Sequence, residues 1–280
     1  MKKIASYALG CKVNQYESEA IAELFAEKGY EVVSVDDEAD VYIINTCTVT
    51  NFGDKKSRQL IRKVKRQNEN AIVAVVGCYA QTAPEELAAV HGVNLVIGTK
   101  DKSKIVELVE DYQAEQGVQN YVTDIMHERV FEPLEIKKLA NRTRAYLKIQ
   151  DGCSQFCSYC IIPYARGPIR SRQPEDVIAE VKRLAENGFK EVVLTGIHVA
   201  SYGKDLKTIT LIDIIRQVHE VEGIERIRFS SIEPNVVTEE FAAAMAELPK
   251  VCDHFHLSLQ SGCDKTCLLY TSDAADDLTR

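Results

Sequence analysis

The stretch Cys153-Ser-Gln-Phe-Cys157-Ser-Tyr-Cys160 places three cysteines at the spacing C-x3-C-x2-C, directly after a predicted strand, Arg144 to Gln150. Three thiolates can hold three of the four irons of a 4Fe-4S cluster, which leaves the fourth iron open to another ligand. A zinc site is the alternative, because Cys157-x2-Cys160 is also typical of zinc hairpins. A structural zinc ion needs four ligands, however, and the next cysteine, Cys252, lies far along the chain. The spacing therefore favours iron-sulfur chemistry.

Outward from this stretch, the second half of the chain repeats strand and helix units. Further strands are predicted at Glu191 to Thr195, Arg226 to Ser230 and His254 to Leu259, and amphipathic helices lie between them. Repeated βα units of this kind predict a barrel or a partial barrel. The cysteine loop would then follow the first strand, on the face where barrel enzymes bind their substrates.

Polar residues and glycine follow these strands. Thr195-Gly196 ends the second strand, where a tight turn is the alternative to a binding role, and Glu233-Pro234 follows the third, where a turn is again the alternative. Three arginines follow the cysteine loop and are expected either to meet a phosphate or carboxylate or to lie on the surface: Arg166, Arg170 and Arg172.

The first half of the chain predicts an open parallel α/β sheet, because short apolar strands alternate with amphipathic helices. The strands are expected at Ile4 to Leu9, Glu31 to Val35, Val41 to Asn45, Ala71 to Val76 and Asn94 to Ile97.

Three cysteines in this half share one position relative to the strands. Cys11, Cys47 and Cys78 each follow the carboxyl end of a predicted strand. Those ends lie along one edge of an open parallel sheet, where ligands bind, so the three thiols can converge there. A free cysteine is often a small buried hydrophobic residue, but three at equivalent positions favour the ligands of a second cluster. Gly10 and Gly77 would let the backbone approach that cluster closely.

Periodicity is lost between the two halves. We therefore expect a first domain at residues 1–112, a linker at 113–142 and a second domain at 143–266. Within the first domain, seven basic residues fall within twelve positions, and we weigh an RNA-backbone contact equally against the solvated face of a helix. They are Lys55, Lys56, Arg58, Arg62, Lys63, Lys65 and Arg66.

Composition indicates an ordinary globular protein, since 45% of the 280 residues are hydrophobic and 27% are charged. The net charge of -8 argues against a surface devoted as a whole to nucleic acid. We expect no membrane-spanning stretch and no signal peptide, and therefore a cytoplasmic protein. In such a protein nine cysteines indicate metal or redox work rather than disulfides.

Four segments together resemble the radical S-adenosylmethionine (SAM) methylthiotransferases, over residues 1 to about 266. They are Leu9-Gly-Cys-Lys-Val-Asn-Gln-Tyr-Glu-Ser-Glu19, Ile44-Asn-Thr-Cys-Thr-Val-Thr50, Gly77-Cys-Tyr-Ala-Gln81, and the three-cysteine loop with Ile162-Pro-Tyr-Ala-Arg-Gly-Pro168. Lys12-Val-Asn-Gln15 and Thr46-Cys-Thr-Val-Thr-Asn51 are most similar to the branch that acts on threonylcarbamoyladenosine in tRNA.

The resemblance implies two 4Fe-4S clusters, an auxiliary one on Cys11, Cys47 and Cys78 and a SAM cluster on Cys153, Cys157 and Cys160. It also implies that Tyr159, Thr195, Gly196 and Glu233 lie near SAM. The implied reaction is methylthiolation of C2 of N6-threonylcarbamoyladenosine next to the tRNA anticodon. The partners expected are the anticodon stem-loop of tRNA and an electron donor such as flavodoxin or ferredoxin, with the enzyme a monomer.

Two other readings stay open: a sister methylthiotransferase acting on isopentenyladenosine in tRNA or on a ribosomal protein, and a non-catalytic zinc or iron-sulfur binding module. The sequence departs from the family after Thr266, where residues 267–280 resemble a translated sequencing adapter and Cys267 is not expected to be a ligand. The radical SAM domain is then incomplete, so we expect the chain as given to be poorly stable and inactive.

Overall fold

The computed structural model describes residues 1–48, 51–136, 144–261 and 263, so the expectations for 267–280 lie outside the described residues. The chain forms two compact units. The first comprises Met1–Glu128, Glu132–Ile136 and Tyr164–Arg166, and the second comprises the described residues of Arg129–Phe131, Lys137–Pro163 and Gly167–Arg280.

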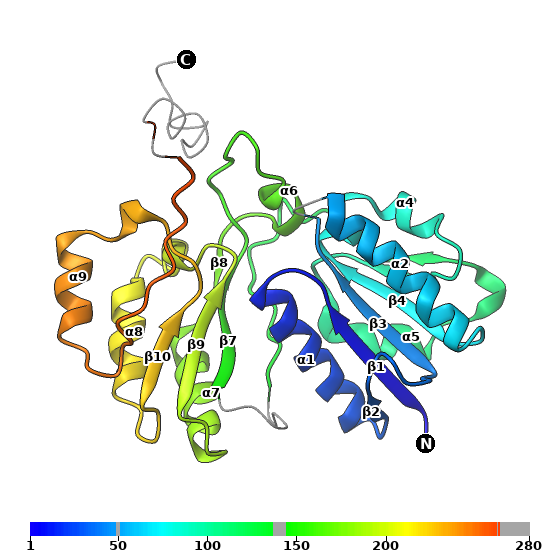
Figure 1. Ribbon diagram of the computed structural model, residues 1–280, viewed down its shortest axis with the longest axis horizontal. Coiled ribbons are helices and arrows are strands. Elements are labelled where there is room, and N and C mark those ends of the chain that lie inside the picture. Colours follow the sequence, from blue (N-terminus) through cyan, green and yellow to red (C-terminus); the bar gives the residue numbers. More distant parts are fainter. Residues whose placement is uncertain (49–50, 137–143, 262, 264–280) are drawn as a thin grey trace. The chain divides into compact units, whose positions relative to one another are not determined.

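The first unit is built on a parallel sheet with the strand order β2-β1-β3-β4-β5-β6 (Figure 1). Its strands are β1 Lys3–Ala8, β2 Glu31–Val33, β3 Val41–Thr46, β4 Ile72–Gly77, β5 Leu95–Ile97 and β6 Gln119–Asn120. Every residue of β3 is buried. Such a strand is typical of a parallel sheet that is covered on both faces.

Helices cover both faces of this sheet (Figure 1). They are α1 Lys12–Glu27, α2 Asn51–Gln67, α3 Cys78–Thr82, α4 Pro84–Ala88 and α5 Ile105–Glu110, with short 3-10 turns η1 Lys102–Lys104 and η2 Ala114–Gln116. Alternate side chains of β3 enter two different cores. Tyr42 and Ile44 pack with residues of α2, α3 and α4, whereas Val41 and Ile43 pack with residues of α1 and α5.

The five strands expected in this half are confirmed, with ends that differ by one or two residues. The segment 113–142, expected to be a linker, contains β6, which pairs with β5. Two paired residues are too short to show a period of two, so the sequence pattern gives no sign of them. Ile125, Leu134 and Ile136 of the same segment are buried.

The second unit contains a sheet with the strand order β10-β9-β7-β8, in which β8 alone runs antiparallel to its neighbour. Its strands are β7 Arg144–Asp151, β8 Arg170–Ser171, β9 Glu191–Gly196 and β10 Arg226–Phe229. Its helical segments are α6 Ile162–Arg166, of which Tyr164–Arg166 belong to the first unit, α7 Pro174–Glu186, η3 Val199–Ser201, α8 Leu211–His219, η4 Pro234–Val236 and α9 Glu239–Ala246.

The two faces of β7 differ in polarity. Ala145, Leu147 and Ile149 enter the core formed with α7, α8 and α9. On the opposite face Lys148 and Gln150 are also buried. Lys148 is neutralised there by Asp151, 2.6 Å from its ammonium nitrogen. The α/β class and the parallel sheet of the first half are confirmed, and the second sheet has the helix-covered outer face and polar inner face of a partial barrel.

The strand expected at His254 to Leu259 was wrong. Isolated bridges join Ile232 to Leu257 and Ile227 to Val251, but no ladder forms among the described residues there. Phe255 stacks on Phe229 with ring centroids 6.0 Å apart, whereas the side chains of Leu257 and Leu259 are exposed. Alternation of polar and apolar residues is not sufficient for a strand, which also needs a hydrogen-bonded neighbour.

Candidate functional site

The first three cysteines lie at the carboxyl ends of three neighbouring strands. Cys11 is the N-cap residue of α1 just after β1, Cys47 directly follows β3, and Cys78 is the first residue of α3, just after β4. The strand register pairs Ala8 with Asn45 and Thr46 with Gly77. Each cysteine therefore lies within three residues of a pairing position at the same sheet edge, as the sequence predicts.

Two glycines allow the backbone to turn closely at this edge. Gly10 has a φ of +92°, and a Cβ there would lie 2.6 Å from both Cβ and Sγ of Cys47. Gly77 has a φ of +95°, and its Cβ would lie 2.4 Å from Oδ1 of Asn45. Both positions exclude a side chain by conformation and by space. The contact at Gly10 also shows that the loop carrying Cys11 touches Cys47.

Asn14 connects the loops that carry these cysteines. Its side-chain nitrogen donates to the carbonyl of Leu9 at 2.8 Å and to the carbonyl of Thr46 at 2.9 Å. Asn45 donates in return to the carbonyl of Asn14 at 3.1 Å. Backbone carbonyls within two residues of Cys11 and Cys47 are therefore held by one buried amide.

Arg166 is fully buried within the first unit, beside the third cysteine. Its Nε donates to Sγ of Cys78 at 3.2 Å, one terminal nitrogen donates to Glu17 at 2.7 Å, and the other donates to Oδ1 of Asn14 at 2.5 Å. Lys102, also fully buried, lies 3.3 Å from Glu17. The guanidinium group thus joins the thiol of Cys78 to a buried carboxylate.

All three arginines after the cysteine loop meet carboxylates, and the surface alternative was wrong for each. Arg170 lies 3.7 Å from Asp151, and Arg172 pairs with Glu180, whose carboxylate is fully buried. Charged side chains are buried in proteins when they are paired in this way.

Burial raises the pKa of the thiols of Cys11 and Cys78, and the positive charge of Arg166 opposes that rise. Burial disfavours a thiolate that has no metal to bind. Ligation would therefore be coupled to loss of protons from these thiols.

Within the described residues, no group of three or more His, Cys, Asp and Glu side chains is spaced to hold a single metal ion. A four-iron cube is wider than a single ion, and its three thiolates bind three different irons. The three thiols with the two glycine turns fit such a cube by donor type, at the edge where β1, β3 and β4 end.

The second group of cysteines lies on the loop after β7. The amide of Cys153 donates to the carbonyl of Gly167 at 3.0 Å, and the amide of Cys160 donates to the carbonyl of Cys157 at 2.9 Å. Phe156 adopts a positive φ of 48°, which turns the loop sharply between the first two cysteines. All three side chains are partly exposed.

The three thiols of this loop interact electrostatically. The pKa of Cys153 is raised to about 11, chiefly by burial and further by the neighbouring thiols of Cys160 and Cys157. The three cysteines lie on one short loop, close enough for the charge of one thiolate to affect the next. This arrangement fits the donor set of an iron-sulfur cluster.

Sequence reasoning missed a polar group beside this loop that contains Gln155 and His198. Gln155 lies 3.1 Å from Glu233 and 3.0 Å from His198, and His198 lies 3.1 Å from the same carboxylate oxygen of Glu233. The hydrogen bond from His198 lowers the pKa of Glu233 below its ordinary value. The one available signal was that His198 follows Thr195-Gly196 at the carboxyl end of β9.

The remaining residues expected near SAM have distinct surroundings. The hydroxyl of Thr195 is buried and donates to the carbonyl of Leu147 at 3.1 Å. A Cβ at Gly196 would lie 2.7 Å from Oε1 of Gln150, which accepts a hydrogen bond from the amide of His198 at 2.8 Å. Tyr159 is 54% exposed. Gly196 therefore lets Gln150 support the loop that carries His198.

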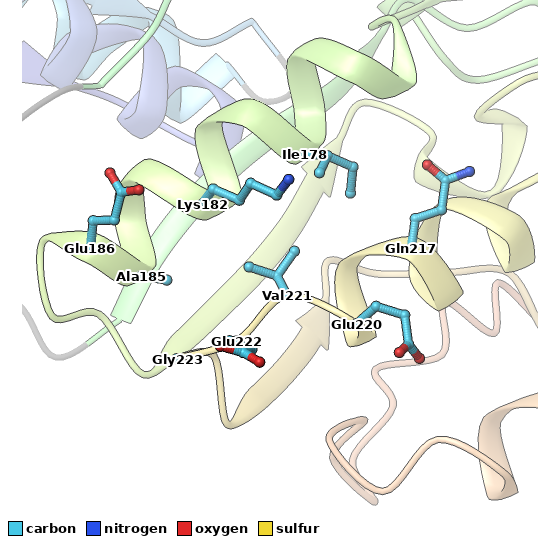
Figure 2. Close-up of a pocket in the computed structure, with 9 residues that line it drawn as sticks. All are labelled: Ile178, Lys182, Ala185, Glu186, Gln217, Glu220, Val221, Glu222 and Gly223. Atoms are coloured by element: carbon cyan, nitrogen blue, oxygen red, sulfur yellow. The ribbon is translucent and has the colours of Figure 1, made fainter.

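A groove of about 700 Å³ lies elsewhere in the second unit, between α7 and α8 (Figure 2). Ile178 and Lys182 line it from α7, Gln217 lines it from α8, and Glu220 lines it from the position directly after α8. Val221 to Gly223 close it just before β10, at the amino ends of the strands. The groove therefore lies at the opposite end of the strands from the cysteine loop.

None of the helices in the described part of the chain is both long enough and apolar enough to cross a membrane.

Two families match the two halves of the chain. Residues 3–98 match the family described as uncharacterized protein family UPF0004, and residues 147–275 match the radical SAM superfamily.

Curated relatives match nearly the whole chain. The threonylcarbamoyladenosine tRNA methylthiotransferase MtaB of Bacillus subtilis (strain 168) is 49% identical over 94% of this chain and 58% of its own length. MtaB of Aquifex aeolicus (strain VF5) is 43% identical over 94% of this chain and 64% of its own. The tRNA-2-methylthio-N(6)-dimethylallyladenosine synthase of Thermoanaerobacter sp. (strain X514) is 37% identical over 91% of this chain and 55% of its own. The chain thus spans about three fifths of the length of these relatives.

Among solved structures, the radical S-adenosylmethionine methyltransferase TsrM from Kitasatospora setae, with cobalamin and a [4Fe-4S] cluster bound, is similar with a TM-score of 0.65. The match covers 98% of this chain and 62% of that one at 15% sequence identity. At this identity the likeness supports the fold.

Proposed function

Because this chain belongs to the radical SAM methylthiotransferase family, we propose that its two cysteine groups hold two 4Fe-4S clusters for the methylthiolation of tRNA. The reaction proposed is methylthiolation of C2 of N6-threonylcarbamoyladenosine next to the anticodon. Since the chain spans 58% of its Bacillus subtilis relative, the activity is proposed for the protein at its relatives' length.

The observation that carries the proposal is the presence of two separate cysteine triads in different surroundings. One triad ends three adjacent strands beside a buried arginine, and the other lies on a single, partly exposed loop. Insertion of sulfur at an unactivated C–H bond needs a radical source and a sulfur donor. Two clusters with different tasks supply both requirements.

When bound, SAM and the second cluster would supply the deoxyadenosyl radical that removes hydrogen from C2, and the auxiliary cluster would supply the sulfur that takes its place. Cys153, Cys157 and Cys160 would leave one iron open for SAM. Tyr159, Thr195, Gly196 and Glu233 are proposed to lie near SAM.

The described residues support a positioning role beside this loop. Gln155 and His198 hold the Glu233 carboxylate in its ionised form, able to accept hydrogen bonds from a SAM amine or ribose hydroxyl. At the other triad, Arg166 and Asn14 fix the cysteine loops without contributing a ligand.

The partners proposed are the anticodon stem-loop of tRNA and an electron donor such as flavodoxin or ferredoxin. We propose a monomer that works in the cytoplasm. The dimethylallyladenosine synthase relative makes the isopentenyladenosine reaction a second candidate, at 37% identity against 49% for the MtaB relative.

Iron and acid-labile sulfide, counted after anaerobic reconstitution, test the cluster assignment. The chain should hold about eight irons, and about four should remain when either triad is changed to alanine. About four irons, lost only with Cys153, Cys157 and Cys160, would contradict the auxiliary cluster. Bound zinc without sulfide would favour a binding module instead.

Nucleoside mass spectrometry tests the substrate. tRNA from a strain that lacks the full-length protein should lose methylthio-threonylcarbamoyladenosine and keep methylthio-isopentenyladenosine. Loss of the second nucleoside in place of the first would assign the protein to the sister reaction.

A further inference from the structure

An open groove of about 570 Å³ lies in the first unit between the end of β1 and one side of α2. Tyr7 and Leu9 line it from the strand side, and Lys56, Arg62, Lys63 and Arg66 line it from the helix. Ala5, two residues before Tyr7, packs in the core beneath α2. Because alternate residues of a strand share a face, Tyr7 and Leu9 continue that face beyond the packed core, and Tyr7 is 39% exposed.

Six of the seven basic residues of α2 divide into two groups, and Lys55 belongs to neither. Arg58 donates to the hydroxyl of Tyr79, and Lys65 donates to the carbonyl of Ala71 at 2.7 Å. Arg58 and Lys65 are therefore engaged in contacts within the first unit.

The cations of α2 that line the groove face solvent. Lys56, Arg62 and Arg66 are exposed, and Lys63 is paired with Asp36. In a chain with a net charge of -8, this groove is therefore a local concentration of positive charge.

We propose that this groove binds the sugar-phosphate backbone of a single-stranded RNA segment, with the ring of Tyr7 as a stacking surface for one base. Sites for single-stranded nucleic acid combine a basic groove with an exposed aromatic ring, and here both occur together. The identification of the RNA as tRNA rests on the proposed function.

The position of the groove gives this surface a role at the auxiliary site. Leu9 lines the groove, and Cys11, the first cysteine of the triad, follows two residues later. RNA held along α2 would therefore be anchored next to the sheet edge where the proposed sulfur-donating cluster lies. A basic helix face that only contacts solvent would not require an exposed aromatic ring beside it or a position next to this sheet edge.

The test measures binding of the full chain to an unmodified tRNA transcript across a range of salt concentrations. The variant K56A/R62A/R66A removes three groove cations. The control K2A/K28A/K55A removes three exposed cations of the same unit that do not line the groove. We expect the groove variant to lose about tenfold in affinity near 0.1 M salt, and the slope of log K against log salt to fall by about two, from three lost contacts of about 0.7 each.

Two single substitutions sharpen the test. Asp36→Asn removes the carboxylate that pairs with Lys63 and should tighten tRNA binding about two- to threefold, a result that loss of folding would not give. Tyr7→Leu should weaken binding about tenfold, whereas Tyr7→Phe, which keeps the ring, should bind like the unaltered chain.

Equal binding by the groove variant and the control would overturn the proposal, as would the absence of tRNA binding by the unaltered chain. SAM cleavage to deoxyadenosine, measured without RNA on the protein at its relatives' length, tests the proposed function separately. Cleavage with unchanged tRNA affinity in the groove variant would reject the groove alone. Loss of tRNA affinity confined to the groove variant, without SAM cleavage by the protein at its relatives' length, would support the groove and reject the radical chemistry.

Discussion

The guanidinium Nε of Arg166 lies 3.2 Å from Sγ of Cys78, and the same guanidinium group is bonded to the buried carboxylate of Glu17. Arg166 follows Cys160 by six residues in the sequence, yet it is part of the first unit. One side chain therefore neutralises a buried carboxylate and donates to a thiol of the proposed auxiliary cluster. Hydrogen bonds to the ligand sulfurs are among the features that set a cluster's reduction potential.

Arg166→Gln should destabilise the first unit and weaken its cluster. We expect a loss of about 3 kcal/mol in the free energy of unfolding, because Glu17 stays buried with Lys102 as its remaining cation. The double variant E17Q/R166Q should recover part of that loss, since it leaves the buried Lys102 with one carboxylate, that of Glu132 at 4.0 Å. Chemical denaturation of the four chains of this cycle measures the coupling.

Arg166→Lys separates a redox role of the guanidinium group from a structural one. It keeps the charge beside Glu17 but loses the planar fork that reaches Cys78 and Asn14 together. We expect near-normal folding and a lower reduction potential of the auxiliary cluster, read by EPR during a redox titration of the reconstituted chain. An unchanged reduction potential of the auxiliary cluster would show that Arg166 contributes to stability alone.

Gly10→Ala should damage the first cysteine site more than the same change elsewhere. Its Cβ would lie 2.6 Å from Cys47, whereas a Cβ at Gly29, which has a similar φ of +86°, meets nothing within 4 Å. Gly29→Ala should cost about 1 kcal/mol from backbone conformation, and Gly10→Ala about 2 kcal/mol more from overlap. Urea unfolding and iron content check both changes, and equal losses in the two variants would refute the close contact.

The strands and the cysteine positions were predictable because they depend on local pattern. Apolar runs of four to six residues between amphipathic helices indicate a parallel sheet, and strand order then places the residues after β1, β3 and β4 at one edge. β6 was not predictable, because its two residues have no period and are paired only once β5 is in place.

The polar contacts around the cysteines were not predictable, because they join residues far apart in the sequence. Arg166 and Glu17 are 149 residues apart, and Gln155 and Glu233 are 78 apart. Nothing in the local pattern distinguishes the buried Arg166 from an arginine on the surface. Helix periodicity indicates a helix after the first strand, but it does not show that the carboxylate of Glu17 is neutralised from another part of the chain.

The capping box at the start of α8 provides a test of stability in the second unit. Oγ1 of Thr210 accepts a hydrogen bond from the amide of Asp213 at 3.3 Å, and Asp213 accepts one from the amide of Thr210 at 2.9 Å. Thr210→Ala should therefore cost about 1 kcal/mol, and Thr210→Ser should cost little. Chemical denaturation of the two variants checks this, and equal stabilities would show that the box contributes nothing.

The pair of Glu233 and His198 should make stability depend on pH in a defined direction. The hydrogen bond from His198 lowers the pKa of Glu233 from its ordinary value of 4.5. A carboxyl group whose pKa is lower in the folded state binds fewer protons there than when unfolded, so its contribution is present above about pH 4.5 and is lost as the pH falls through the lowered pKa. The difference in unfolding free energy between the unaltered chain and Glu233→Gln should therefore be constant at higher pH and shrink in acid.

In a His198→Asn background, which removes the main cause of the shift in the pKa of Glu233, the same difference in unfolding free energy should vary less with pH. A difference that stays constant into acid in both backgrounds would show that His198 does not hold Glu233 ionised.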